Sequence, residues 1–194
     1  MIAFVNGRFV TKLPSQVVVD VNGVGYELQI SLNTYSSISN SENGKLYTYL
    51  HITENAQTLY GFFDNAEKEL FLHLISISGV GAATARMMLS GLKPDEIVKA
   101  IVQNNTRQLE SIKGIGRKTA ERIVLELKDK LGRLQTNQTE TPYSHNTMET
   151  DALNALISLG IQKNAAEAAL KKVILSNSNN PSIEHIIKLA LKNL

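Results

Sequence analysis

The chain has 194 residues, of which 43% are hydrophobic and 20% charged, and its formal net charge at pH 7 is +2. This length suffices for two or three small domains, and no apolar run approaches the roughly 18 residues that a membrane span needs. Cysteine is absent, which excludes disulfides, thiolate metal sites and cysteine nucleophiles. The first residues lack the basic-then-apolar order of a signal peptide. We therefore expect a soluble cytoplasmic protein.

Residues 1–63 are predicted to form a small all-β domain. Short β-rich runs separated by turn residues lie at 2–5, 16–21, 26–30, 45–51 and 58–63. Asn22-Gly23 is a strong type I′ hairpin signal between the second and third runs, and residues 33–39 can form one short helix. Five strands with a helical interruption indicate a Greek-key barrel of the OB type, a fold that commonly binds nucleic acid or oligosaccharide. The alternative is a small barrel used only for assembly.

Residues 64–132 are predicted to be helical and to hold an internal repeat. The triplet Gly79-Val80-Gly81 recurs 35 residues later as Gly114-Ile115-Gly116. The match continues on both sides of the glycines, in the pairs Leu74 and Leu109, Ala85 and Ala120, and Leu89 and Val124. Each triplet is typical of the tight turn in a helix-hairpin-helix unit, with the central Val80 or Ile115 pointing inward. Helices are predicted to begin at Asp64, Ala82, Pro94, Arg107 and Arg117, the last of them ending near Leu131.

The chemistry expected of these hairpins is phosphate binding. The second glycine opens a helix whose first N–H groups have no intrahelical partner, and the positive end of the helix dipole favours an anion there. Four basic residues flank the second hairpin: Lys113, Arg117, Lys118 and Arg122. Phosphate contacts carry no sequence information, so the expected ligand is a nucleic-acid shape. The alternative is a pair of plain helix–helix turns, but a repeat in register with basic flanks favours backbone binding.

Residues 133–148 are polar and rich in Thr, Gln and Asn, which predicts a flexible linker. Residues 149–194 are predicted to form a UBA-like module of three short helices, running from Asp151 to Leu159, from Asn164 and from Pro181. The apolar residues Leu156, Leu159 and Ile161 surround Gly160. Core packing is their default role, but an exposed cluster would mark a site for a protein partner.

No catalytic constellation is apparent, and the four histidines lack metal-ligand spacing. A Walker-type phosphate loop is missing, so the chain is not expected to hydrolyse ATP. Glycosylases with one helix-hairpin-helix carry a catalytic Asp beyond the hairpin, whereas residues 130–148 contain no Asp and only Glu140 within the predicted linker. We therefore expect no catalytic residues, no metal and no cofactor. A general DNA-repair or RNA-binding scaffold and a glycosylase or nuclease remain the alternative functions.

Taken in this order, the barrel, tandem hairpins, linker and three-helix module resemble the RuvA family, the Holliday-junction-binding subunits of the bacterial branch-migration machine. The most specific stretches are 22–27, 54–62, 79–81 and 114–122. The resemblance implies a homotetramer, one or two of which hold an open four-way junction in homologous recombination and DNA repair. It also implies a RuvB ring ATPase and a RuvC resolvase as partners, in the bacterial cytoplasm.

The resemblance also implies roles for individual residues. DNA-backbone contacts fall on Gly79, Val80, Gly81, Lys113, Gly114, Ile115, Gly116, Arg117, Lys118 and Arg122. An acidic pin falls at Glu54, followed by Asn55 where the family usually has a second acid. The contact with RuvB falls at or near Leu156, Leu159, Gly160 and Ile161, the last replacing the usual aromatic. Ala82-Ala83 replace the usual Pro-Lys, so the first hairpin is expected to use backbone N–H groups together with Arg86.

Overall fold

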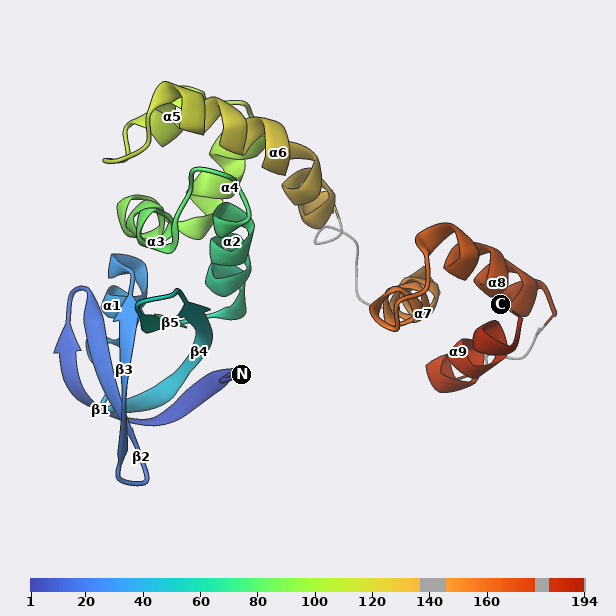
Figure 1. Cartoon of the computed structure of the whole chain (residues 1–194), viewed down its shortest axis with the longest axis horizontal. Coiled ribbons are helices and arrows are strands. Elements are labelled where there is room, and N and C mark those ends of the chain that lie inside the picture. Colours follow the sequence, from blue (N-terminus) through green and yellow to red (C-terminus); the bar gives the residue numbers. More distant parts are fainter. Residues whose placement is uncertain (137–145, 177–181, 194) are drawn as a thin grey trace. The chain divides into compact units, whose positions relative to one another are not determined.

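A computed structural model of the chain describes residues 1–136, 146–176 and 182–193 (Figure 1). The chain divides into two compact units, Met1–Asn137 and Gln138–Leu194. The first unit contains the barrel and the hairpin helices, and the second contains the carboxyl-terminal helices. No helix among the described residues is both long and apolar enough to span a membrane.

The amino-terminal part of the first unit is a closed five-stranded barrel with the strand order β1-β2-β3-β5-β4. The strands are β1 (Phe4–Leu13), β2 (Gln16–Val21), β3 (Val24–Ile30), β4 (Asn43–Ile52) and β5 (Gln57–Phe62). Neighbouring strands are antiparallel, except that β3 and β5 run parallel. Helix α1 (Leu32–Ile38) connects β3 to β4. This five-stranded barrel with one helix confirms the OB-type prediction.

The turn between β2 and β3 also matches its prediction. Asn22 and Gly23 have φ values of 52° and 88°, the two positive values that a type I′ turn requires. The first strand was predicted at residues 2–5 but runs from Phe4 to Leu13. Its register with β2 shifts between Phe9 and Thr11, and this irregularity breaks the alternation from which a strand is predicted.

The remaining helices of the first unit are α2 (Asn65–Ile75), α3 (Ala82–Gly91), α4 (Pro94–Val102), α5 (Thr106–Glu110) and α6 (Arg117–Thr136). Their core is continuous with the barrel, because Tyr60 and Phe62 of β5 pack against Phe71 of α2, with ring centroids 5.1 Å and 4.9 Å apart. Helices α2 and α3 contact barrel elements, whereas α5 and α6 pack against α4. In Figure 1, α5 and α6 lie at the end of this unit away from the barrel.

The predicted linker is wrong at both ends. Helix α6 continues to Thr136 and α7 begins at Asn146, so the ends of the 133–148 segment are helical. Polar residues such as Gln and Arg are good helix formers, so a polar composition alone did not identify where the helices stop. Residues 137–145, the middle of the predicted linker, lie outside the described residues.

The second unit consists of α7 (Asn146–Ser158), α8 (Lys163–Ser176) and α9 (Ile183–Lys192). Its small core is formed by Ala152, Leu156, Ala166, Ala169, Leu170, Val173, Ile186 and Ala190. Gly160 ends α7 with a φ of 88°. The N–H of Ile161 donates to the carbonyl of Leu156 at 3.1 Å, and that of Gly160 to Ile157 at 2.9 Å. This pair of hydrogen bonds is a Schellman motif, which satisfies the last carbonyls of the helix.

Candidate nucleic-acid interface

The two predicted hairpins have the same backbone. Gly79 and Gly114 have φ values of 93° and 92°, which only glycine adopts without strain. The N–H of Val80 donates to Ile77 O at 3.0 Å, and the N–H of Ile115 donates to Ile112 O at 3.0 Å. Val80 and Ile115 are 4% and 5% exposed. The central residues therefore point inward, and the sequence repeat is also a structural repeat.

The helices that follow the hairpins lack side-chain caps. Helices α1, α2, α5 and α9 begin with a Ser, Asp or Asn whose side chain accepts a hydrogen bond from the first turn: Ser31, Asp64, Asn105 and Ser182. The N-cap residue of α3 is Gly81, and no side chain caps this helix. Gly116, which precedes α6, has no side chain with which to cap it. The first N–H groups of both helices are therefore left for an external acceptor, which suits an anion.

The second glycine of each hairpin is not required by the fold. A Cβ atom placed on Gly81 or Gly116 would meet nothing within 4 Å. Gly81 has an extended conformation, with φ −81°, that any residue adopts. The absence of a side chain leaves room outside the molecule in front of the free N–H groups. A close-approaching ligand such as a phosphate explains both glycines, because a side chain there would stand in its way.

The four basic residues at the second hairpin are exposed but not equivalent. Arg117 Nε lies 2.9 Å from Glu121 Oε1, and Arg122 Nε lies 2.7 Å from Glu126 Oε1. The hydrogen bond that Arg117 donates to Glu121 raises the pKa of Arg117. Lys113 and Lys118 form no ion pair within the described part of the chain. The lysines are thus the cations most readily available to a phosphate.

The first hairpin is differently equipped. Ala82 is buried and Ala83 exposed, so neither brings a charge. Arg86 Nη1 donates to the carbonyl of Ser15 at 3.1 Å and to Gln29 Oε1. Both acceptors belong to the barrel, so the guanidinium contacts the protein itself. The assignment of Arg86 to DNA stays a prediction of the sequence.

Glu54 and Asn55 lie at the tip of the turn between β4 and β5, and both are exposed. The N–H of Thr53 closes the turn by donating to Ala56 O at 2.9 Å. The Glu54 carboxylate therefore projects into solvent from the end of a hairpin. A fixed negative charge in this position repels phosphate and attracts none.

Glu67 has a structural role that the sequence did not predict. Asp64 accepts a hydrogen bond from the Glu67 N–H at 2.7 Å, as the helix-start signal predicted. The Glu67 carboxylate, however, is buried against α1, where it accepts hydrogen bonds from Ser31 Oγ and, at 2.6 Å, from Thr34 Oγ1. Burial raises the pKa of this carboxyl. Its partners lie more than 30 positions earlier, so no local pattern could reveal the contact.

The predicted partner-binding residues fall in three environments. Leu156 is fully buried in the core of the second unit, and Ile161 packs against that core partly exposed. Leu159 is 61% exposed, and Gly160 is exposed beside it. Leu159 is therefore the apolar side chain of this set that a partner can reach.

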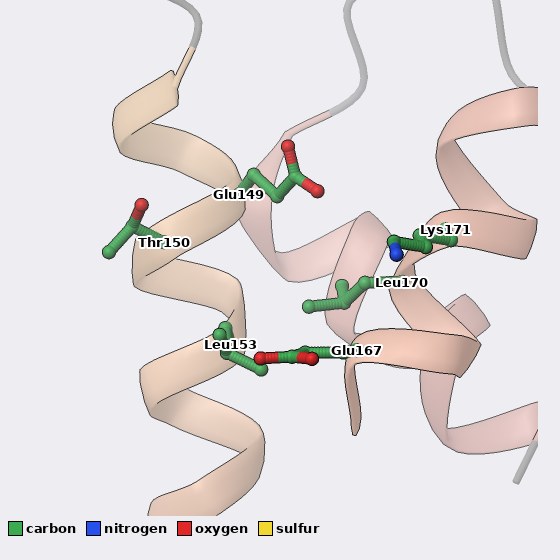
Figure 2. Close-up of a pocket in the computed structure, with 6 residues that line it drawn as sticks. All are labelled: Glu149, Thr150, Leu153, Glu167, Leu170 and Lys171. Carbon is green, nitrogen blue, oxygen red and sulfur yellow. The ribbon is translucent and has the colours of Figure 1, made fainter. Parts of the chain in front are cut away.

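A separate hollow of about 380 Å³ lies between α7 and α8 in the second unit. Figure 2 shows Leu153 of α7 and Glu167 of α8 facing each other across it, with Leu170 close by. Glu149, Thr150 and Lys171 complete its lining. The lining thus combines two leucines with two carboxylates and one ammonium group. Within the described ranges, no three His, Asp or Glu side chains gather as a metal site.

Comparison with known proteins assigns all three parts of the chain. The family model described as RuvA N terminal domain matches residues 1–61, that described as SAM-like Helix-hairpin-helix tandem matches 71–129, and that described as RuvA, C-terminal domain matches 147–194. A protein of Cytophaga hutchinsonii named Holliday junction branch migration complex subunit RuvA is 46% identical, with 99% of each chain covered.

Proteins of the same name from Amoebophilus asiaticus and Bacteroides fragilis are 43% and 41% identical over 99% and 100% of this chain, and each is covered completely. Such identity over whole chains, together with the amino- and carboxyl-terminal family models, leaves one assignment. The chain belongs to the RuvA family.

Proposed function

We propose that this chain is a non-catalytic DNA-binding subunit that recognises four-way junctions, holds them open, and recruits and stimulates a RuvB ring ATPase for branch migration. The observation that carries the proposal is the pair of matched hairpins, each ending in an uncapped helix that opens with a glycine the fold does not need. The names of the relatives, which describe subunits of a branch migration complex, support the same role.

Each hairpin binds one stretch of DNA backbone through N–H groups and contributes little charge of its own. The net charge of +2 is small for a DNA-binding protein, so one copy should bind weakly. A homotetramer presents eight hairpins to the four arms of one junction and gains affinity by multivalency. One or two tetramers fit this role, and a RuvC resolvase is a further partner of the resulting complex. Many phosphate contacts make the binding strongly salt-dependent.

The Glu54 turn acts at the crossover, where its carboxylate repels phosphates and helps to separate strands. Asn55 beside it is neutral, so each copy contributes one negative charge at this tip. Glu54→Gln removes the repulsion without shortening the side chain. Junction affinity should then be unchanged or higher, while strand separation decreases.

The second unit carries the contact with the ATPase. Leu159 and Gly160 present an exposed apolar corner at the end of α7, whereas the lining of the hollow in Figure 2 includes two carboxylates and the ammonium group of Lys171. Leu159→Asp should abolish stimulation of the RuvB ATPase and leave DNA binding intact. Glu149→Lys reverses a charge at the hollow. If Glu149→Lys abolishes stimulation and Leu159→Asp does not, the contact with the ATPase lies at the hollow and not at Leu159.

The decisive experiment is a competition gel shift of a four-way junction against linear duplex of the same total length, with the mass in solution measured in parallel. Preference for the junction by a tetramer or octamer is the expected result. Equal affinity for both DNAs would favour a general DNA-repair or RNA-binding scaffold. Strand cleavage by the purified chain would instead establish an enzyme.

A further inference from the structure

Arg86 joins the helix after the first hairpin to the barrel. It lies on α3, five residues after Gly81, and its Nη1 atom donates to Ser15 O at 3.1 Å and to Gln29 Oε1. Ser15 lies in the turn between β1 and β2, and Gln29 lies in β3. One guanidinium therefore connects the first hairpin with two separate parts of the barrel.

The Arg86 side chain lies beside strands β3 and β5 of the barrel. Arg86 lines a hollow of about 390 Å³ together with Glu27, Gln29, Thr58 and Tyr60 of β3 and β5. Burial raises the pKa of Tyr60, and the positive charge of Arg86 partly offsets this rise. Arg86 is partly buried and is in no ion pair in the part of the chain that the structure describes. Its two neutral acceptors leave the guanidinium anchored without cancelling its charge.

Two further contacts fix the rest of α3. Ser90 Oγ donates to Arg86 O at 2.8 Å and accepts from the Leu32 N–H at 3.1 Å. Asn33 Nδ2 donates to Leu89 O and, at 2.9 Å, to Leu92 O. These bonds hold the carboxyl-terminal half of α3 to α1. Of the α3 residues whose side chains make these bonds, Arg86 and Ser90, Arg86 is the nearer in sequence to the hairpin.

The barrel residue that Arg86 contacts leads directly to the Glu54 turn. Gln29 of β3 is paired with Tyr60 of β5, and β5 begins at Gln57, immediately after that turn. The connection runs from Gly81 through one turn of α3 to Arg86, across to Gln29, and along β5 to Glu54. The Arg86 hydrogen bonds thus lie on a short path between the first hairpin and the acidic turn.

We infer that Arg86 is a positioning residue that fixes the first hairpin relative to the Glu54 turn and thereby selects a four-way junction over linear duplex. The inference rests on the proposed function. A linear duplex needs only the hairpins, because it has no crossover for the turn to meet. A junction must satisfy both features at one fixed separation, so loosening α3 penalises the junction and spares the duplex.

The experiment compares full-length Arg86→Met, Gln29→Leu and the double variant with the wild type, measuring affinity for a junction and a duplex over a salt series. Arg86→Met keeps the aliphatic stem, and Gln29→Leu removes the acceptor without touching α3. Each single variant should lose about tenfold of the junction preference. Duplex affinity should stay within about twofold. The double variant should be no worse than Arg86→Met alone, because the contact with Gln29 is already lost in that variant.

A conservative variant and the thermal melt complete the design. Gln29→Glu keeps an acceptor for Arg86 and should retain the junction preference. If Arg86→Met does not fold, the pair Gln29→Leu and Gln29→Glu decides the matter alone. Circular dichroism melts of all variants show whether folding has changed.

A direct phosphate contact by Arg86 predicts the opposite behaviour. Gln29→Leu would then leave junction affinity equal or increase it by freeing the guanidinium, while Arg86→Met would weaken junction and duplex alike with a shallower salt dependence. That result would overturn the inference and leave the proposed function standing. A wild type with no junction preference would overturn the proposed function itself.

Discussion

The two hairpins share one backbone but differ in what surrounds it. Their φ angles and hydrogen bonds agree position by position across the repeat. Around the first, the nearest basic side chain, Arg86, contacts the barrel. Around the second, exposed basic residues gather at the start of α6, at the end of the unit away from the barrel (Figure 1).

This difference separates two requirements of DNA binding. The proposed function assigns phosphate binding to the shared backbone, in which Val80 stands opposite Ile115 and both glycines occur in each copy. The surroundings of the hairpins differ in the proposed function: contacts with the barrel position the first hairpin, and the lysines are expected to attract DNA to the second. Both hairpins should therefore be essential. Removing a charge should weaken the general attraction to DNA only at the second hairpin, whereas Arg86→Met at the first should reduce the preference for the junction.

The largest expected effect comes from adding a methyl group in front of the free N–H groups. The Cβ atom added by Gly116→Ala or Gly81→Ala meets no other protein atom within 4 Å, so stability should hardly change. A phosphate that can no longer reach the N–H groups loses charge-assisted hydrogen bonds worth about 1.5–3 kcal/mol each. Junction affinity in a gel shift should fall at least tenfold for each variant.

Gly132→Ala provides the matched control. Gly132 lies within α6, and a Cβ atom there also meets nothing within 4 Å. Alanine in a helix interior is more stable than glycine by about 0.5–1 kcal/mol, so melting temperature should rise while affinity stays unchanged. Gly114 is a poorer test because its φ of 92° makes any side chain strained. Unchanged junction affinity in Gly81→Ala and Gly116→Ala would refute the phosphate-binding hairpin.

The second prediction concerns the charge at the second hairpin. Lys118→Gln removes a cation that forms no ion pair among the described residues. Affinity at low salt should fall by about threefold to tenfold, and the slope of log affinity against log salt should become shallower by about 0.9 for each phosphate that is no longer neutralised. Lys45→Gln on the barrel, where the ammonium lies 4.5 Å from the Tyr47 ring centroid, should leave the slope unchanged. An unaltered slope for Lys118→Gln would argue against a phosphate contact there.

A smaller gain is expected from Glu121→Gln. Glu121 accepts a hydrogen bond from Arg117 at 2.9 Å, so the substitution frees the guanidinium and removes a negative charge. Exposed pairs of this kind are weak because solvent screens them, so the rise in affinity at low salt should be no more than about fivefold. Glu184→Gln breaks the matching Lys188 pair on α9 and should have no effect. Weaker DNA binding with Glu121→Gln would mean that the ion pair orders Arg117 for its role.

The sequence predicts those features of each hairpin that depend on interactions between residues close together in the chain. The turns were predicted because the glycines and the buried Val80 and Ile115 lie within a few residues of their hydrogen-bond partners. The contacts that position the first hairpin were not, because Arg86 and Ser15 are 71 positions apart. The buried Glu67 is likewise 36 positions from Ser31. Local patterns reveal the hairpin backbone, and only the folded chain reveals the contacts that hold it in place.

The smallest expected effect concerns the buried Glu67 carboxylate, which joins α2 to α1. Because burial raises the pKa of Glu67 above its ordinary value of 4.5, the folded state holds its proton more tightly than the unfolded chain does. The resulting stabilisation is fully present below the ordinary value and is lost as pH rises through the folded pKa. Glu67→Gln keeps a similar shape but has no proton to lose.

Between pH 4 and pH 7.5, the free energy of unfolding of the wild type should therefore decline relative to that of Glu67→Gln, measured by urea unfolding of the full chain. A difference between the two proteins that does not change with pH, or that grows in favour of the wild type as pH rises, would show that the hydroxyls of Ser31 and Thr34 stabilise the ionised carboxylate enough to outweigh its burial.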